Sequence, residues 1–187
     1  PIHHESGKLV SGVYRFALDE ENVRVTNTLE DKNLFATFVT QNPDCQYGAD
    51  GIAFDRDGNL YVGNFGDASI NRITFREDGS LLDNQVIAQD FSQLESTDGM
   101  VFDEKGNLYI ADFNANAIAV MTPDGTLRRV AQSPDSDGLH GELNQPGEPI
   151  VWDGRVIASC FDLVTGPGKV NTGHSMPATL AQLELEP

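Results

Sequence analysis

The chain has 187 residues, an apolar fraction of 39% and a formal net charge of −17. This length suits one ordinary domain with a buried core, and the recurring Phe, Leu, Ile and Val exclude global disorder. The excess of acidic residues argues against nucleic acid and anionic membrane surfaces as partners, and it suits a protein that holds a cation. No apolar run approaches the ~18 residues of a membrane-spanning helix.

The N-terminus and the cysteines leave the cellular compartment open. The first ten residues, PIHHESGKLV, have neither the basic start nor the apolar stretch of a secretion signal. A signal removed earlier would leave no trace, so cytoplasmic and secreted or periplasmic locations all fit a soluble chain. Cys45 and Cys160 fit no zinc motif, and a disulfide between them stays open in an oxidising compartment.

Residues 1–47 are interpreted as an N-terminal segment followed by the end of a first repeat unit. The stretch GVYRFALDEENVRV within it is similar to the second half of the units that follow. This similarity predicts two strands in the first segment.

An internal repeat dominates the middle of the chain. The segment ADGIAFDRDGNLYVGNF at residues 49–65 recurs as TDGMVFDEKGNLYIADF at residues 97–113, so Asp50 and Asp98 stand 48 residues apart. Apolar residues alternate with other residues in each copy, and Asp, Gly and Asn mark the turns, which is typical of short β-strands. Two more apolar runs follow each copy. Residues 48–95 and 96–146 are therefore predicted to form two units of four strands each.

A third, degenerate copy comes near the end of the sequence. GEPIVWDGRVIASCF at residues 147–161 has a turn two residues shorter, in which Asp153 and Gly154 predict a tight hairpin. This alignment places Glu148 at the position of Asp98. Residues 147–187 are expected to supply three strands of an incomplete unit.

Four-stranded units of about 40–50 residues are typical of β-propeller blades. We therefore predict an all-β fold, a single β-propeller domain of which this chain carries about four blade lengths and thirteen strands. The predicted strands start and stop within a blade. We accordingly expect a part of a six-bladed propeller, an open arc, or an assembly in which chains associate through unpaired blade edges.

The predicted blades aim several acidic side chains at one end of the channel. Within a blade the first strand lines the channel, and the long loops between blades fall on the face where that strand begins. Asp50, Asp98 and Glu148 begin the innermost strands at this face. A ring of carboxylate oxygens at a channel mouth suits a hard cation such as Ca²⁺. The alternative is that each Asp-Gly pair only forms the turn into its strand.

Three further residues are candidates for the channel mouth. Asn64 and Asp112 end the second strands on the same face and would add amide and carboxylate oxygens. His174 lies on the long final loop, from which it would act as a ligand or a proton shuttle. Exposed loop histidines are nevertheless common, so a solvated side chain remains the alternative for His174.

The segment TDGMVFDEKGNLYIADF resembles part of the SMP-30/gluconolactonase/LRE-like family of six-bladed propellers, and the likeness extends over roughly residues 12–185. In that family a PDGM-type motif supplies a metal-binding Asp, often proposed as the general base, which implies both roles for Asp98. One blade earlier the family has PNG with Asn as a ligand, and here ADG puts Asp50 in that position. The family's early metal-binding Glu and its substrate-contacting Asn and Arg precede the matched part.

The resemblance implies a metal-dependent hydrolase of sugar or related lactones, with Ca²⁺ as the first choice of cofactor and Zn²⁺ as the second. The cation would polarise the lactone carbonyl, and Asp98 would help to deprotonate the attacking water. The sequence contains no Gly-x-Ser-x-Gly motif for a covalent route. A non-catalytic propeller module that binds a protein or small ligand, with a structural Ca²⁺, is the alternative.

Overall fold

The computed structural model of the chain describes residues 2–3, 7–163, 170 and 178–184. Within these residues the fold is all-β, and fourteen strands form four antiparallel sheets, two of three strands and two of four. Each sheet is a meander, since its strands pair in the order in which they follow one another along the chain. No helix in the described part is long and apolar enough to cross a membrane.

The first two sheets cover the N-terminal half. The first sheet consists of β1 (Ile2–His3), β2 (Leu9–Tyr14) and β3 (Leu34–Val39). The second sheet consists of β4 (Ala49–Phe54), β5 (Leu60–Asn64), β6 (Ser69–Phe75) and β7 (Leu81–Gln89).

The other two sheets follow in the same manner. The third sheet consists of β8 (Met100–Phe102), β9 (Leu108–Asp112), β10 (Ala117–Met121) and β11 (Leu127–Gln132). The fourth sheet consists of β12 (Pro146–Trp152), β13 (Arg155–Cys160) and β14 (Leu180–Glu184).

The prediction of two strands in the first segment was wrong. The first sheet has three strands, because β1 pairs with β2 and places Ile2 opposite Val10. A strand of two residues is too short to show an alternating pattern, so β1 could not be predicted from its own residues.

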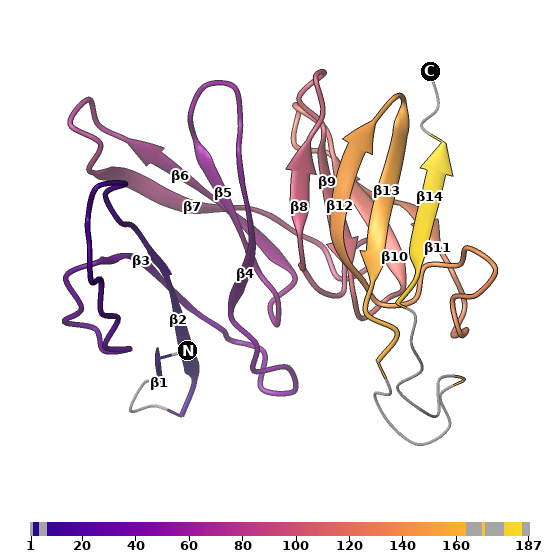
Figure 1. Cartoon of the computed structure of the whole chain (residues 1–187), viewed down its shortest axis with the longest axis horizontal. Coiled ribbons are helices and arrows are strands. Elements are labelled where there is room, and N and C mark those ends of the chain that lie inside the picture. Colours follow the sequence, from indigo (N-terminus) through magenta and orange to yellow (C-terminus); the bar gives the residue numbers. More distant parts are fainter. Residues whose placement is uncertain (1, 4–6, 164–169, 171–177, 185–187) are drawn as a thin grey trace.

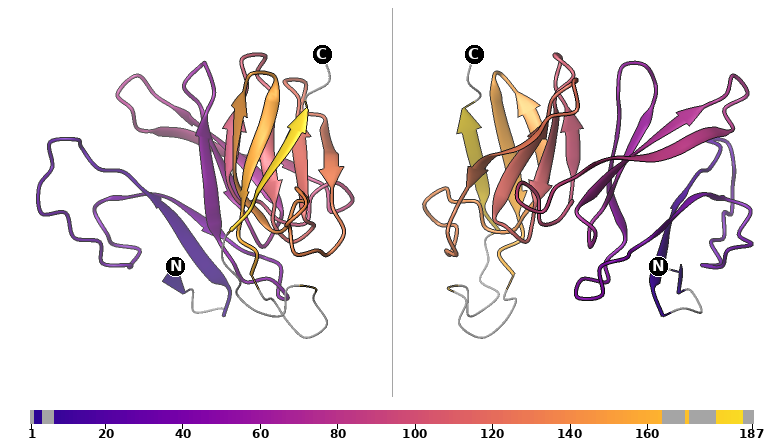
Figure 2. Two further views of the ribbon diagram at one scale, coloured as in Figure 1. Left: turned by 45° about the vertical axis from the view of Figure 1, so that its right-hand side comes forward. Right: turned by 180° about the vertical axis from the view of Figure 1, so that it is seen from behind.

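The sheets stand side by side like the blades of a propeller (Figures 1 and 2). The chain runs from the first sheet, drawn in indigo, to the fourth, drawn in orange and yellow, without crossing back over an earlier sheet. The inner strand β8 contacts β4 on one side and β12 on the other. The fold is therefore built from β-propeller blades, as the 48-residue spacing of Asp50 and Asp98 predicted.

Apolar side chains fill the space between neighbouring blades. The first and second sheets meet at Ala36, Phe38, Leu60, Val62 and Ile73. The second and third sheets share a larger cluster of Tyr61, Ala68, Ile70, Leu94, Met100, Leu108, Ile110, Ala119 and Met121. The third and fourth sheets meet at Tyr109, Ala111, Ile118, Val120, Leu143, Val156, Ala158, Cys160 and Ala181. These clusters fix each blade against the next, so the inner strands hold a defined spacing.

The hairpins at the opposite end of the inner strands follow the repeat closely. Asp55 accepts hydrogen bonds from the backbone N–H of Asn59 at 2.8 Å and from its side-chain amide at 2.8 Å. Asp103 accepts the same pair of bonds from Asn107, both at 2.8 Å. The FDRDGN and FDEKGN segments are therefore turns, as the sequence predicted.

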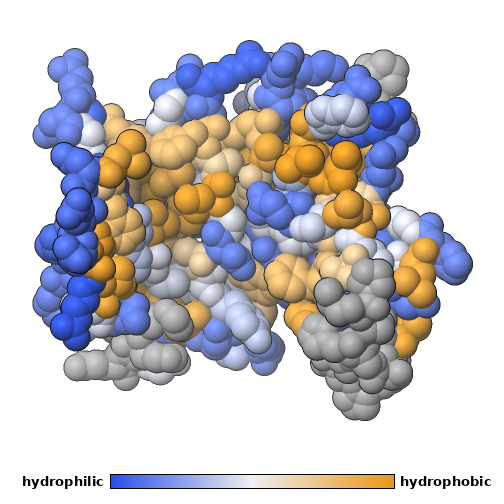
Figure 3. Space-filling model, viewed as in Figure 1, coloured by the Kyte–Doolittle hydropathy of each residue, from blue (hydrophilic) through white to orange (hydrophobic). Residues whose placement is uncertain are grey.

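The fourth sheet presents an apolar face to solvent. Ile150, Trp152 and Leu180 are 51%, 61% and 67% exposed, and Figure 3 shows hydrophobic surface over the region of β4, β8 and β12. In the blades before it, the corresponding surfaces are buried against a neighbour. Exposed apolar surface of this kind favours association.

We expect the isolated chain to self-associate through this face. Substituting Trp152→Lys should shift the protein towards monomer, because a charge would have to be buried in the contact. Light scattering coupled to size-exclusion chromatography measures the effect over a dilution series. Leu29→Lys, an exposed position in the first segment, is the control, and an equal shift in both variants would contradict the expectation.

Candidate functional site

Three carboxylates lie at the starts of three neighbouring inner strands. Asp50 is the second residue of β4, Asp98 stands two residues before β8, and Glu148 is the third residue of β12. In Figure 1, β8 and β12 run upwards, so these residues lie at the lower end of the sheets. The backbone N–H of Asp98 donates to the carbonyl of Ala111 at 2.9 Å, which fixes the approach to β8. We refer to Asp50, Asp98 and Glu148 as the carboxylate cluster.

The glycine that follows each aspartate allows the inner strands to approach closely. A Cβ on Gly51 would lie 2.1 Å from the carbonyl oxygen of Asp98. A Cβ on Gly99 would lie 2.1 Å from Oε2 of Glu148 and 2.5 Å from the carbonyl oxygen of Gly147. The N–H of Gly99 donates to this same carbonyl of Gly147 at 2.7 Å. In each Asp-Gly pair the aspartate supplies a carboxylate. The glycine, which has no Cβ, leaves room for the next blade to approach closely.

Gly51→Ala is expected to lower the free energy of unfolding by about 1–3 kcal/mol, because the added methyl group collides with backbone. Chemical denaturation followed by circular dichroism measures this loss. Gly125→Asn is the comparison variant, because Gly125 has open space around it and only its φ of +85° is strained there, a conformation that asparagine adopts more readily than most residues. A Gly51→Ala protein as stable as the wild type would contradict the close approach of β4 and β8.

The structure corrects the alignment of Glu148. Ile52 pairs with Val62 and Met100 with Ile110, two residues after Asp50 and Asp98. In the fourth sheet the equivalent partner, Ala158, pairs with Pro149. Gly147 therefore takes the register position of the two aspartates, and Glu148 lies one residue further on, opposite Ser159.

The shift of Glu148 has a local cause. The hairpin between β12 and β13 has two residues, Asp153 and Gly154, with φ of 48° and 72°. Positive φ at both positions is the conformation of a type I′ turn, so the predicted tight hairpin is confirmed. Because this turn is shorter than its counterparts and β12 carries a register irregularity between Pro146 and Glu148, the pairing advances by one residue. The longer Glu side chain still reaches over Gly99 towards Asp98.

The members of the carboxylate cluster affect one another's protonation. Burial, the charge of Asp50 and, more weakly, the charge of Glu148 raise the pKa of Asp98 to about 7. Burial and then the charge of Asp50 raise the pKa of Glu148, and burial raises the pKa of Asp50. Each shift has the sign expected when carboxylates share a partly desolvated site without a compensating cation.

The oxygen atoms of the carboxylate cluster are of the kind that binds a hard divalent cation. Carboxylate oxygens are the ligands that Ca²⁺ prefers, and the unfavourable charge of neighbouring carboxylates is relieved by a cation. Within the described ranges, no three His, Cys, Asp or Glu side chains lie close enough together to form a preorganised metal group. The cluster therefore supplies ligand chemistry, while its side chains stand further apart than in a closed coordination shell.

Asn64 and Asp112 lie inside the protein and anchor loops. Asp112 is fully buried, and it accepts hydrogen bonds from the backbone N–H of Glu95 and Ser96, each at 2.9 Å. Arg129 lies 3.3 Å from the same carboxylate. Asn64 is buried too, and its Oδ1 accepts a bond from the Thr40 hydroxyl at 2.9 Å. Their placement differs from the expected position at the channel mouth.

Asp67 performs in the second blade the task that Asp112 performs in the third. Its carboxylate accepts from the backbone N–H of Gln41 and Asn42, each at 2.8 Å, and so holds the loop before β4. Sequence reasoning missed this role because the two aspartates do not occupy equivalent positions in the repeat. The signal in the sequence that could have indicated this role is the position of Asp67, an acidic residue at a turn.

The remaining sequence candidates do not add to the cluster. His174 lies outside the described residues. Cys45 and Cys160 are free thiols, and burial raises the pKa of both. The residues that make up the cluster are thus Asp50, Asp98 and Glu148.

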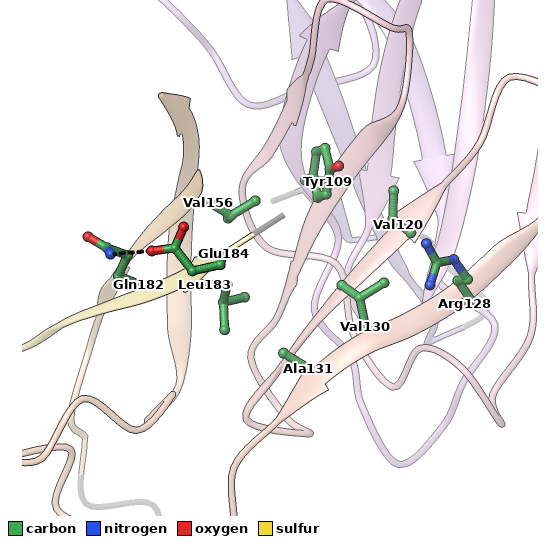
Figure 4. A pocket seen from close by; sticks show the side chains of 9 residues that line it. All are labelled: Tyr109, Val120, Arg128, Val130, Ala131, Val156, Gln182, Leu183 and Glu184. Carbon is green, nitrogen blue, oxygen red and sulfur yellow. Dashed lines mark hydrogen bonds between the residues drawn. The ribbon is translucent and has the colours of Figure 1, made fainter. Parts of the chain in front are cut away.

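A cleft elsewhere on the molecule has a different character. It measures about 390 Å³ and lies between the outer strand β11 of the third sheet and β14 of the fourth (Figure 4). Apolar side chains such as Val130 and Leu183 line it, and Gln182 donates to Glu184 at 3.2 Å at its edge. None of the carboxylate cluster lines this cleft.

Comparison with known proteins supports the fold. No protein-family model and no curated protein matches the chain. Among solved structures, a luciferin-regenerating enzyme is similar with a TM-score of 0.52 and 14% identity, over 81% of this chain and 52% of that chain. This likeness concerns the propeller fold alone.

Two further propellers are similar at lower TM-scores. A gluconolactonase from Xanthomonas campestris has a TM-score of 0.48 and 19% identity, over 84% of this chain and 52% of that one. A calcium-binding regucalcin from Agrobacterium tumefaciens has a TM-score of 0.45 and 16% identity, over 66% of this chain and 41% of that one. The chain spans about half the length of these three propellers.

Proposed function

We propose that the chain belongs to a metal-dependent hydrolase of lactones, with the carboxylate cluster at its reactive centre. The observation that carries the proposal is the convergence of Asp50, Asp98 and Glu148 at the starts of three neighbouring inner strands. A gluconolactonase and a calcium-binding regucalcin among propellers of similar fold are consistent with this class of reaction. A cation bound there would polarise the lactone carbonyl and stabilise the oxyanion that develops.

Asp98 is suited to move the proton. Without a cation, burial and the neighbouring carboxylates raise the pKa of Asp98 to about 7. A cation bound beside it would lower this pKa and keep the carboxylate ionised, in the form that accepts a proton. In the proposed reaction, Asp98 accepts a proton from the water whose oxygen attacks the carbonyl carbon. The ring C–O bond then breaks, and Asp98 returns the proton to the leaving alkoxide. Water and lactone thereby give the open hydroxy acid.

Asp50 and Glu148 have supporting roles in this proposal. Asp50 would serve with Asp98 as a ligand of the cation, and the charge of Asp50 also raises the pKa of Asp98. Glu148 lies over Gly99 beside Asp98 and would complete the acidic surface that the cation and the substrate meet. Ca²⁺ is the first choice because all three donors are carboxylates, and Zn²⁺ is the second.

The test is hydrolysis of glucono-δ-lactone, δ-valerolactone and δ-decalactone in a pH-stat, with and without a chelator. Turnover that stops with chelator and returns with added Ca²⁺ or Zn²⁺ is the expected result. Turnover that ignores the chelator would overturn the metal-dependent reaction. Absence of turnover in a protein shown to bind Ca²⁺ would favour the alternative, a non-catalytic propeller module with a structural cation.

Calcium affinity is expected to rise with pH. The proton on Asp98 competes with the cation, and the pKa of about 7 for this carboxyl places the competition near neutrality. Between about pH 6 and about pH 8 the deprotonated fraction of such a group rises about tenfold, and the affinity should follow it. Isothermal titration in buffers with different ionisation enthalpies measures both the affinity and the proton release. An affinity that is flat over this interval would exclude Asp98 as a ligand.

A further inference from the structure

Four aromatic side chains form a continuous row across the blades. Tyr47, Phe65, Phe113 and Phe161 contact one another in this order, with ring centroids 5.5, 5.9 and 5.6 Å apart. The three phenylalanines directly follow β5, β9 and β13, and Tyr47 belongs to the loop before β4. We refer to these four residues as the aromatic row.

The aromatic row runs beside the carboxylate cluster. The N–H of Phe65 donates to the carbonyl of Gly48 at 2.9 Å, two residues before Asp50. The ring of Phe161 packs on Gly147, where a Cβ would lie 2.4 Å from Cε2, and Gly147 directly precedes Glu148. The rings therefore lie at the same end of the sheets as the carboxylates. The three phenylalanines follow the second strand of each blade, whereas the carboxylates stand at the start of the first, inner strand.

The exposure of the rings changes along the row. Phe65 is only 8% exposed and Phe113 is half-buried, so the middle of the row is fixed by the packing of the blades. Tyr47 and Phe161, at the two ends, are 67% and 51% exposed. The exposed rings of Tyr47 and Phe161, held in place by the buried middle of the row, therefore provide apolar contact area at little cost in side-chain entropy.

We propose that the aromatic row is the apolar half of the ligand site and binds the hydrocarbon part of a cyclic ester. This inference rests on the proposed function for the ester group, whose carbonyl would lie at the carboxylate cluster. Phenyl rings bury alkyl groups favourably but offer no hydrogen bonds to hydroxyl groups that lose water on binding. The site therefore prefers lactones that carry an alkyl substituent over polyhydroxylated sugar lactones.

The kinetic test compares δ-decalactone with glucono-δ-lactone. The wild-type protein should show the higher kcat/KM for δ-decalactone, and Phe161→Ala should lower this value by about fivefold to tenfold, mainly through KM. The value for glucono-δ-lactone should hardly change. Phe16→Ala, which removes an exposed phenylalanine from the first segment, is the matched control and should leave both values unchanged.

A binding measurement separates this inference from the proposed function. The lactam 6-pentyl-2-piperidinone keeps the ring and the alkyl chain of δ-decalactone but resists hydrolysis, and 2-piperidinone lacks the chain. Calorimetric titration should show tighter binding of the pentyl lactam. This preference should shrink more in Phe161→Ala, whose ring packs on Gly147 beside Glu148, than in Tyr47→Ala at the far end of the row. If lactams bind in this way while no lactone is hydrolysed, the proposed hydrolase is wrong and the aromatic row stands. Equal affinity for both lactams, or affinities unchanged in both variants, would overturn the inference.

Discussion

Asp98→Asn is expected to lower the rate of lactone hydrolysis by about 10²–10⁴-fold, because the substitution removes the group that accepts and returns the proton. The fold should be unaffected, since asparagine has the same shape and Asp98 is only half-buried. Rates of δ-valerolactone hydrolysis at saturating Ca²⁺ measure the loss. Asp78→Asn is the control, because Asp78 accepts a backbone bond from Ser80 in an exposed turn far along the second blade.

The stability of the same variant checks the protonation of Asp98. Its pKa is raised from 3.8 to about 7, so the folded state binds this proton more tightly than the unfolded chain does. The stabilisation from this carboxyl is fully present below about pH 3.8 and is lost as the pH rises through about 7. Asp98→Asn should therefore be more stable than the wild type above neutrality, and the difference should vanish in acid. The reverse order above neutrality would contradict the raised pKa.

Asp112→Ala is expected to lower the free energy of unfolding by about 3–5 kcal/mol, because it removes a buried acceptor from several donors. The N–H groups of Glu95 and Ser96 would lose their partner, and so would the hydroxyl of Ser96, which donates at 3.0 Å. Arg129 would lose the shorter of its two carboxylate contacts, at 3.3 Å. Urea denaturation followed by fluorescence of the single tryptophan measures the change.

Two further variants serve as controls for Asp112→Ala. Asp112→Asn keeps an oxygen acceptor and should lose less stability than Asp112→Ala. Asp19→Ala, at an exposed position in the first segment, should behave like the wild type. If Asp112→Ala proves as stable as Asp19→Ala, then the loop before β8 does not depend on this carboxylate.

Most of the fold could be predicted from the internal repeat in the sequence. The alternation in residues 49–65 and 97–113 marks strands, and the Asp, Gly and Asn residues between them mark the turns that Asp55 and Asp103 make. These are local properties, decided within a few residues, so a single sequence displays them. The two-residue strand β1 was not predicted, because its pairing with β2 defines it and its own residues show no pattern.

The site was less readable because it depends on pairing between strands. The equivalence of Asp50 and Asp98 is visible in the repeat, but the position of Glu148 follows from the register of β12 against β13. Likewise, Asp112 carries no sign that its partners are backbone groups sixteen and seventeen residues earlier. The recurrence of Phe65, Phe113 and Phe161 was visible in the repeat, yet only the ring contacts join them into one surface.

Binding of Ca²⁺ tests most directly whether the carboxylate cluster acts as one site. Isothermal titration at about pH 8 should show one Ca²⁺ per chain in the wild-type protein, since the carboxylates are then ionised. In the double variant Asp50→Asn/Asp98→Asn this binding should disappear, while Asp78→Asn should retain it. Calcium binding that survives the double substitution, or a wild-type protein that binds none, would contradict the account.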